Sequence, residues 1–219
     1  LLWAKPLCNI GILFILIAHR KERTITMNTV QFGIDTFGEL AYHDDTHKLL
    51  SYEESLRMIV EEVKLADTLG IDVVALGEHH RAEYSISAPD TVLAALSQVT
   101  KNITLGTGVT VLSSDDPVRV YERFATLDAL SNGRAQVMVG RGSFIESFPL
   151  FGYNLEDYNE LFEEKLEMFH ALLDNAPISW EGKFTQRLEN TQVYPKLSKR
   201  LDVHVGVGGS PDSIIRAAK

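Results

Sequence analysis

Short apolar runs alternate with amphipathic stretches along most of the chain. Apolar residues recur at helical spacing over residues 56–66 and 155–173, which predicts two helices that each bury one face. Runs rich in Val, Ile and Leu predict five strands, over residues 30–35, 71–76, 103–112, 135–139 and 201–207. This alternation is typical of a parallel sheet covered by helices, which is either an open doubly wound sheet or an eightfold barrel. The periodicity alone does not decide between these two closures.

Residues suited to helix ends and turns support this division into elements. Ser51-Tyr52-Glu53-Glu54 is a capping box, in which the serine and the second glutamate satisfy backbone N–H groups of the first turn. Gly70 is predicted to end the same helix in a left-handed conformation. Asp116-Pro117 opens a later helix, because proline is tolerated in the first turn. Residues 178–194 are predicted to be an insertion, with a hairpin at Trp180–Phe184.

The amino-terminal region has a different pattern. Leu7 to Ala18 is almost continuously apolar, but the run is too short for a stable membrane span. Most of the nearby charge follows the run, whereas a signal peptide carries its charge before it. The first predicted strand begins just after Met27. We therefore expect residues 1–26 to be a spurious upstream extension or, alternatively, a membrane-associating leader, and residues 27–219 to form the working domain.

Composition and charge then narrow the classes of function. The 219 residues carry a net charge of -9, and the sequence has no cluster of Lys and Arg with interleaved aromatic residues, which argues against a nucleic-acid partner. Cys8 is the single cysteine, so the chain can form neither an internal disulfide nor a cysteine-based metal site. This cysteine usage fits a cytoplasmic location. With 45% hydrophobic residues, the chain can bury a substantial core.

The strongest candidate for chemistry is Glu78-His79-His80, which follows the second predicted strand. Barrel enzymes place their reacting groups at the carboxyl ends of strands. Neighbouring strand residues face opposite sides, so both histidines cannot enter one pocket, and the sequence indicates no metal site here. One inward histidine would act as an acid, a base or a hydrogen-bond donor to a ligand. The alternative is a structural histidine whose ring is satisfied by the backbone.

Three glycine-rich segments interrupt or follow predicted strands. Gly106-Thr107-Gly108-Val109 indicates either the close approach of a ligand or a bulge within its strand. Gly140-Arg141-Gly142-Ser143 presents an arginine that would reach a planar or anionic ligand, or else a solvated surface turn. Gly206 to Pro211 joins a strand to a helix, where successive N–H groups and the helix end favour phosphate binding over an ordinary turn.

Taken in order, these motifs resemble the bacterial luciferase-like family of flavin-dependent monooxygenases. The likeness runs from Met27 to the end of the chain. Its segments are Glu78–His80, Leu105–Leu112, Asp116–Arg119, Thr126–Arg134, Val139–Gly142 and Gly208–Pro211. The resemblance implies a (β/α)8 TIM barrel. Because residues 27–219 contain only five predicted strands, we expect the barrel to be truncated after about five βα units, as in a fragment of a longer protein.

The resemblance also implies roles for individual residues. His79 matches the active-site histidine beside the reactive edge of the flavin, and Arg141 matches a basic residue near that flavin. The remaining cofactor-binding positions are Gly108 and Val109 at the isoalloxazine ring, where relatives can carry a cis peptide bond, and Gly208, Gly209 and Ser210 at the phosphate. Light emission is not implied, because Gly140 stands where the luminous enzymes have a reactive cysteine.

The implied activity is oxidation of a small organic substrate by molecular oxygen and reduced FMN, which a separate flavin reductase supplies. The barrel would exclude water, and His79 would donate or accept a proton. The resemblance further implies a homodimer. Two alternatives stay open: a non-catalytic flavin-binding relative or partial subunit, and an oxidoreductase that transfers hydride with a deazaflavin. The identity of the substrate cannot be read from the sequence.

Overall fold

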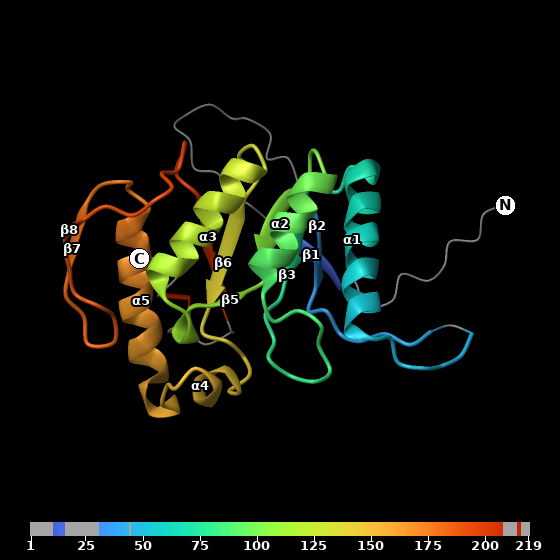
Figure 1. Cartoon of the computed structure of the whole chain (residues 1–219), viewed down its shortest axis with the longest axis horizontal. Helices are drawn as coiled ribbons and strands as arrows, with labels where there is room; N and C mark the ends of the chain where they lie inside the picture. Colours follow the sequence, from blue (N-terminus) through green and yellow to red (C-terminus); the bar gives the residue numbers. More distant parts are fainter. Residues whose placement is uncertain (1–10, 16–30, 44, 208–213, 216–219) are drawn as a thin grey trace.

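The computed structural model describes residues 11–15, 31–43, 45–207 and 214–215. Parallel strands form its centre, and helices lie along one side of them (Figure 1). The parallel strands are β2 (Gln31–Thr36), β3 (Val73–Leu76), β4 (Thr104–Thr107), β5 (Thr110–Val111), β6 (Gln136–Gly140) and β9 (Asp202–Val205). The predicted α/β class is therefore confirmed.

The parallel strands lie side by side in chain order. β2 pairs with β3, and β3 with β4, with Gly33 opposite Val73 and Val73 opposite Thr104. β6 pairs with β5 on one side and with β9 on the other. An isolated bridge between Leu105 and Ala135 connects β4 to β6 and so links the two sheets. Chain-order pairing brings the carboxyl ends of all these strands to one rim, whereas closure into an eightfold barrel stays a prediction.

The covering helices follow the same order across the molecule (Figure 1). They are α1 (Tyr52–Leu69), α2 (Pro89–Val99), α3 (Pro117–Leu130) and α5 (Tyr158–Leu172). Each packs against the next one, α1 on α2, α2 on α3 and α3 on α5. Three short helical segments lie near the rim, η1 (Leu112–Ser114), α4 (Ser147–Leu150) and η2 (Leu155–Asp157). No helix in the described ranges combines the length and apolar character that crossing a bilayer requires.

The helix ends form as their residues predict. The Ser51 Oγ accepts the N–H of Glu54 at 3.2 Å, and the Glu54 carboxylate accepts the N–H of Ser51 at 2.9 Å. Gly70 ends α1 with a φ of 80°, a conformation that glycine adopts without steric strain because it has no Cβ. The Asp116 carboxylate caps α3 by accepting the N–H groups of Val118 and Arg119. Local chemistry therefore determines where these helices begin and end.

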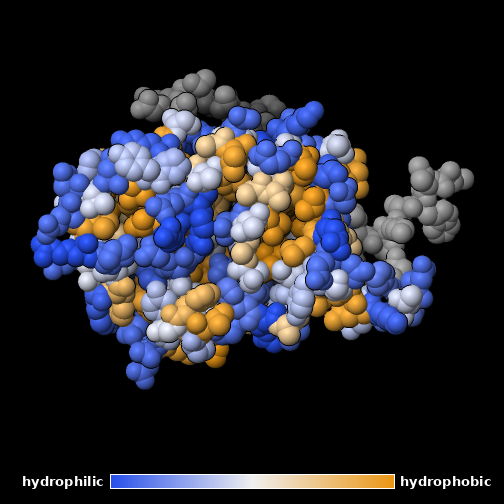
Figure 2. Space-filling view, viewed as in Figure 1, coloured by the Kyte–Doolittle hydropathy of each residue, from blue (hydrophilic) through white to orange (hydrophobic). Residues whose placement is uncertain are grey.

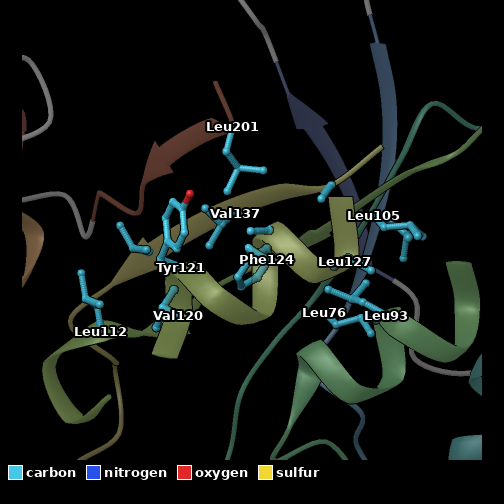
Figure 3. Packing of buried hydrophobic residues seen from close by; sticks show 14 of the residues in the cluster. Leu76, Leu93, Leu105, Leu112, Val120, Tyr121, Phe124, Leu127, Val137 and Leu201 are labelled. Carbon is cyan, nitrogen blue, oxygen red and sulfur yellow. The ribbon is translucent and has the colours of Figure 1, made fainter. Parts of the chain in front are cut away.

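The hydrophobic core lies between the helices and the strands. Figure 3 shows Val120, Tyr121, Phe124 and Leu127 of α3 directed toward the sheet, where Val137 of β6 meets them. These side chains are at most 2% exposed. Burial of side chains of this size contributes roughly 1.5–3 kcal/mol each. The core therefore holds the strands, and with them the rim, in fixed relative positions.

Two elements differ from the prediction. The run over residues 103–112 was predicted as one strand, but it is divided into β4 and β5 at the Gly108–Val109 peptide bond, which is cis, as the resemblance implied. The insertion does contain an antiparallel hairpin, of β7 (Ile178–Trp180) and β8 (Leu188–Thr191), but its connection is longer than residues 180–184 suggested.

One further strand belongs to the amino-terminal region. β1 (Gly11–Ile15) pairs with β2 in the antiparallel direction, with Gly11 opposite Asp35 and Ile15 opposite Gln31. It thereby lies along the edge of β2 that β3 leaves free. That residues 1–26 stand outside the working domain, which begins at residue 27, stays a prediction.

Candidate active site

His79 lies on the turn that follows β3, and aromatic rings surround it. Its imidazole is half-buried, with ring centroids 4.4 Å from Tyr84, 4.9 Å from Phe144 and 5.1 Å from Phe37. The His79 N–H donates to the carbonyl of Ile86 at 2.9 Å, which fixes the backbone of the turn. These rings come from three loops at the rim, and they leave the imidazole among apolar surfaces.

This environment favours the neutral imidazole. Burial lowers the pKa of His79 below its usual value, and the carboxylates of Glu146, Glu39 and Glu78 offset part of that effect. A neutral imidazole carries one nitrogen that accepts a proton and one that donates. His79 can therefore act as a base or as a hydrogen-bond donor near neutral pH.

His80 faces different surroundings, as expected from the sequence, although both histidines lie beyond the end of β3 at Leu76. Its Nε2 lies 3.0 Å from the Oε1 of Glu78, and its ring meets that of Phe151 edge-on at 5.1 Å. Among the residues that the structure describes, no group of three or more His, Cys, Asp or Glu side chains is arranged to hold a metal ion. The two adjacent histidines thus belong to separate environments.

Val109 and Gly140 form a closely packed wall at the rim. A Cβ added to Gly140 would lie 2.7 Å from the Cγ2 of Val109, well inside van der Waals contact. A Cβ on Gly206 would lie 3.0 Å from the Cγ1 of the same valine. The N–H of Gly108 donates to the carbonyl of Leu76 at 2.8 Å and ties this wall to β3. Residue 140 must therefore lack a side chain while Val109 stays where it is.

Arg141 continues from this wall toward the start of α5. Its Nη1 donates to the Oδ1 of Asn159 at 2.9 Å, and its guanidinium lies 5.1 Å from the centre of the Tyr158 ring. The Tyr158 hydroxyl donates to the carbonyl of Gly142 at 2.8 Å. Stacking and hydrogen bonding hold the arginine, yet guanidinium N–H groups are left over for an anion.

The described candidate residues thus lie at one rim of the sheet. Gly108 and Val109 meet Gly140, Arg141 follows directly, and Phe144 of the same segment packs on His79. Gly208, Gly209 and Ser210 lie outside the described residues, so the phosphate-binding turn stays a prediction. Sequence reasoning missed the aromatic neighbours of His79, because Phe37, Tyr84 and Phe144 are far apart in the chain and share no motif.

A buried lysine, also missed, supports the segment that follows β5. Lys165 of α5 is 1% exposed, and its Nζ donates to the carbonyl of Ser113 at 2.7 Å and lies 3.9 Å from the centre of the Tyr153 ring. Burial lowers the pKa of Lys165 to about 8, although Asp115 and Asp116 act in the opposite direction. A regular helical pattern concealed this residue, which occupies a core position of its helix.

Apolar side chains also gather on the surface beside the site. Figure 2 shows them at the lower edge of the molecule, over α4. Ile145, Leu150 and Phe151 of this region are 61%, 60% and 50% exposed. The segment that covers His79 therefore also presents an apolar outer surface.

Comparison with models of known protein families assigns the chain to one of them. The model of the luciferase-like monooxygenases matches residues 30–219. The chain belongs to this family. The resemblance seen in the sequence is thereby confirmed.

Individual relatives of the luciferase-like chain are longer than it is. It is 31% identical to 4-hydroxyprotoasukamycin monooxygenase of Streptomyces nodosus subsp. asukaensis, over 72% of the chain and 43% of the relative. The monooxygenase RslO1 of Streptomyces bottropensis superposes with a TM-score of 0.72 and 28% identity, over 77% of the chain and 52% of that structure. The chain thus spans about half the length of these relatives.

Two more distant structures share the fold alone. The oxygenating constituent of 3,6-diketocamphane monooxygenase of Pseudomonas putida, solved with FMN, has a TM-score of 0.62 and 21% identity. It covers 77% of this chain, which matches 50% of that structure. An F420-dependent secondary alcohol dehydrogenase has a TM-score of 0.64 and 21% identity, over 77% of this chain and 52% of that one.

Proposed function

We propose that the protein is a flavin-dependent monooxygenase, which uses reduced FMN and oxygen to oxidise a small organic substrate. The observation that carries this proposal is His79, a half-buried imidazole with a lowered pKa among aromatic rings at the carboxyl rim. Membership of the luciferase-like monooxygenases supports the reaction class. The FMN in the diketocamphane monooxygenase supports the choice of cofactor.

The residues at the rim fit a flavin. The wall of Val109 against Gly140 is smooth, because the glycine has no side chain, and such a surface suits a flat ring. Arg141 offers a fixed cation beside it. When bound, FMN supplies the reaction with oxygen, since no side chain of the protein carries that chemistry.

The protein's own residues would bind, shield and move protons. One ring nitrogen of His79 accepts or donates a proton at the reacting centre, which its lowered pKa permits near neutral pH. Phe37, Tyr84 and Phe144 exclude water around that nitrogen. The exposed apolar residues beside Phe144 favour an apolar substrate over a charged one.

Binding of the cofactor phosphate is assigned to Gly208, Gly209 and Ser210 on the sequence pattern. Ser210→Asp would place a negative charge in that turn and should weaken FMN binding about tenfold or more. Titration of the protein with FMN measures this, and Ser198→Asp provides a control with the same substitution away from the turn. A flavin reductase and a second copy of the chain are the partners that we propose.

A deazaflavin oxidoreductase is the second candidate, because the F420-dependent dehydrogenase has the same fold. A flavin-binding protein without turnover is the third, because the chain spans about half the length of its relatives. Both candidates use the same rim and differ in the cofactor retained or in the reaction that follows.

Purification with each cofactor distinguishes these functions. We expect the protein to retain FMN rather than F420, and to consume oxygen when reduced FMN and an apolar aldehyde or ketone are supplied. Retention of F420 with no oxygen uptake would favour hydride transfer. Retention of FMN with oxygen uptake no faster than free reduced FMN would favour the binding protein.

A further inference from the structure

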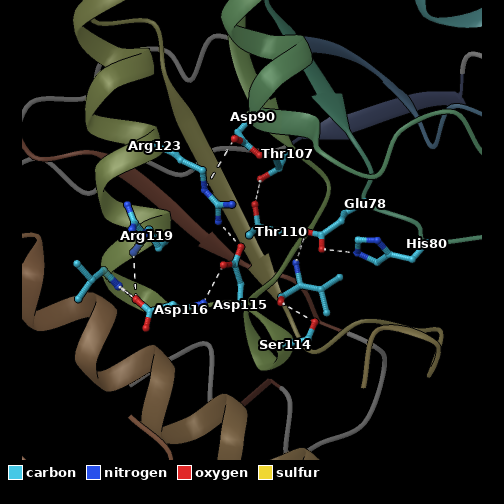
Figure 4. A network of polar contacts seen from close by, with 12 residues as sticks. Glu78, His80, Asp90, Thr107, Thr110, Ser114, Asp115, Asp116, Arg119 and Arg123 are labelled. Atoms are coloured by element: carbon cyan, nitrogen blue, oxygen red, sulfur yellow. Dashed lines mark hydrogen bonds and ion pairs between the residues drawn. The ribbon is translucent and has the colours of Figure 1, made fainter. Parts of the chain in front are cut away.

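Glu78 has two partners on the side of the turn that faces away from His79. Its side chain is 8% exposed, and Oε1 lies 3.0 Å from the Nε2 of His80. Its Oε2 accepts the backbone N–H of Val111 at 2.9 Å, across 33 residues of sequence. Figure 4 shows the carboxylate between these two partners, one from the same turn and one from β5. Both oxygens of a buried carboxylate are thus engaged, as buried charge requires.

The hydrogen bond from Val111 to Glu78 lies beyond the end of the β3–β4 ladder and links the chain after β3 to β5. β3 and β4 pair as far as Leu76 and Thr107, and Gly108 then donates to the Leu76 carbonyl. Beyond this point the chain turns to β6, with Val111 opposite Gly140. On the β3 side, the Glu78 side chain takes the place of a main-chain acceptor.

A cavity of about 170 Å³ adjoins this carboxylate. Its lining includes Glu78, His80, Ser114, Asp115 and Arg123. Arg123 pairs with Asp115 and closes the wall opposite Glu78 (Figure 4). The rest of the lining is partly apolar and includes Ala88, Pro89, Phe124 and Phe151. On this side of the turn, the hydrogen bond from Val111 to Glu78 therefore ties β5 to the turn beside a cavity rather than within close packing.

We propose that Glu78 is a positioning residue that holds β5 and thereby sets the Val109 wall relative to His79. His79 and Glu78 are adjacent in the chain, while Val109 and Val111 flank Thr110. One side chain therefore links the turn that carries His79 to the strand that follows Val109. Its consequence for cofactor binding rests on the proposed flavin function.

Two conservative substitutions separate the reach of the side chain from its charge. Glu78→Asp keeps the charge but shortens the side chain by one methylene, so the carboxylate no longer reaches the Val111 N–H. Glu78→Gln keeps an oxygen at the same distance and loses the charge. Glu83→Asp is the matched control, because Glu83 belongs to the same loop, its side chain is 62% exposed, and its carboxylate pairs with the side chain of Arg81 rather than with β5.

Amide hydrogen exchange of the cofactor-free protein measures the link directly. We expect Glu78→Asp to accelerate exchange at Val111 about tenfold, because a buried donor loses a charged acceptor. Exchange in Glu78→Gln and Glu83→Asp should stay within about threefold of the wild type, since the acceptor is kept or was never involved. Unchanged exchange at Val111 in Glu78→Asp would overturn the proposal.

Flavin affinity and the visible spectrum of the bound flavin test the second half of the proposal. We expect Glu78→Asp to weaken FMN binding about fivefold and to shift the spectrum of the bound flavin. The FMN affinity of Glu78→Gln should lie between those of Glu78→Asp and the wild type. Faster exchange with wild-type affinity and spectrum would show that β5 does not set the cofactor wall. A wild-type protein that binds neither FMN nor F420 would refute the proposed function, and the exchange data would still decide how β5 is held.

Discussion

The two sides of the Gly77–His80 turn contrast in chemistry. On one side, the His79 ring contacts aromatic rings, and within the described residues no hydrogen bond engages it. On the other side, the Glu78 carboxylate binds His80 and the Val111 N–H. The His79 ring nitrogens therefore have no hydrogen-bond partner among the described residues, whereas the Nε2 of His80 lies 3.0 Å from the Glu78 carboxylate. Two adjacent histidines thus have different environments, because the turn after β3 directs their side chains to opposite sides.

Removal of His79 should produce the largest effect. We expect His79→Ala to lower turnover roughly 100-fold or more, which is typical for the loss of a general acid or base, while flavin affinity stays nearly unchanged. Steady-state oxygen uptake and FMN titration measure the two quantities.

The contrast between the histidines is sharpened by His80→Ala. Here we expect turnover to fall less than about tenfold, because the lost contact supports Glu78 rather than the reacting atoms. Equal losses in both variants would break the comparison and remove the special role of His79.

A side chain at Gly140 should produce the next effect. Gly140→Ala places its Cβ 2.7 Å from the Cγ2 of Val109, so the valine must move. Overpacking of this kind costs about 1–3 kcal/mol, and thermal or denaturant unfolding measures it. Val109→Ala removes the colliding methyl groups, so the double variant should recover at least half of the loss. Additive losses in the double variant would contradict the contact.

Lys165 also supports the segment after β5, through its hydrogen bond to the Ser113 carbonyl. Its shifted pKa predicts that the stability of the protein depends on pH. The pKa of about 8 lies below the ordinary lysine value of 10.5, so the unfolded chain binds more protons between these two pH values. The free energy of unfolding should therefore rise with pH through that interval, by about 2 kcal/mol between about pH 7.5 and 9.5. Lys165→Met removes the titrating group and should abolish this rise. The same pH dependence in wild type and variant would show that Lys165 keeps an ordinary pKa.

Tyr84→Phe should have the smallest effect. The tyrosine ring is the nearest aromatic neighbour of His79, and the substitution keeps the ring while removing the hydroxyl. We expect turnover to change less than about threefold, because ring packing rather than a proton relay shields the imidazole. A loss as large as that of His79→Ala would assign the hydroxyl a direct part in the reaction.

The sequence predicted features that depend on neighbouring residues. The capping box at Ser51, the left-handed Gly70 and the start of α3 at Asp116 are local, and the structure confirms each of them. The order of strands and helices also followed from periodicity. The four-residue α4 escaped prediction, because so short a segment has no helical period to detect.

Features that depend on distant contacts could not be predicted in this way. The hydrogen bond between Glu78 and Val111 spans 33 positions, and no sequence motif predicts it. The rings around His79 meet only after separate loops reach the same rim. Lys165 occupies a core position in a helix that the charge pattern describes as amphipathic, so its burial follows from packing against η1.

The antiparallel β1 has a consequence for how the sheet can grow. Each strand offers two hydrogen-bonding edges, and β2 uses one for β3 and the other for β1. A parallel strand that completed a ring would need the edge that residues 11–15 occupy, so the two arrangements are mutually exclusive. The amino-terminal strand and a closing strand would therefore compete for the same edge of β2, and only one of them can pair with that edge in any single molecule.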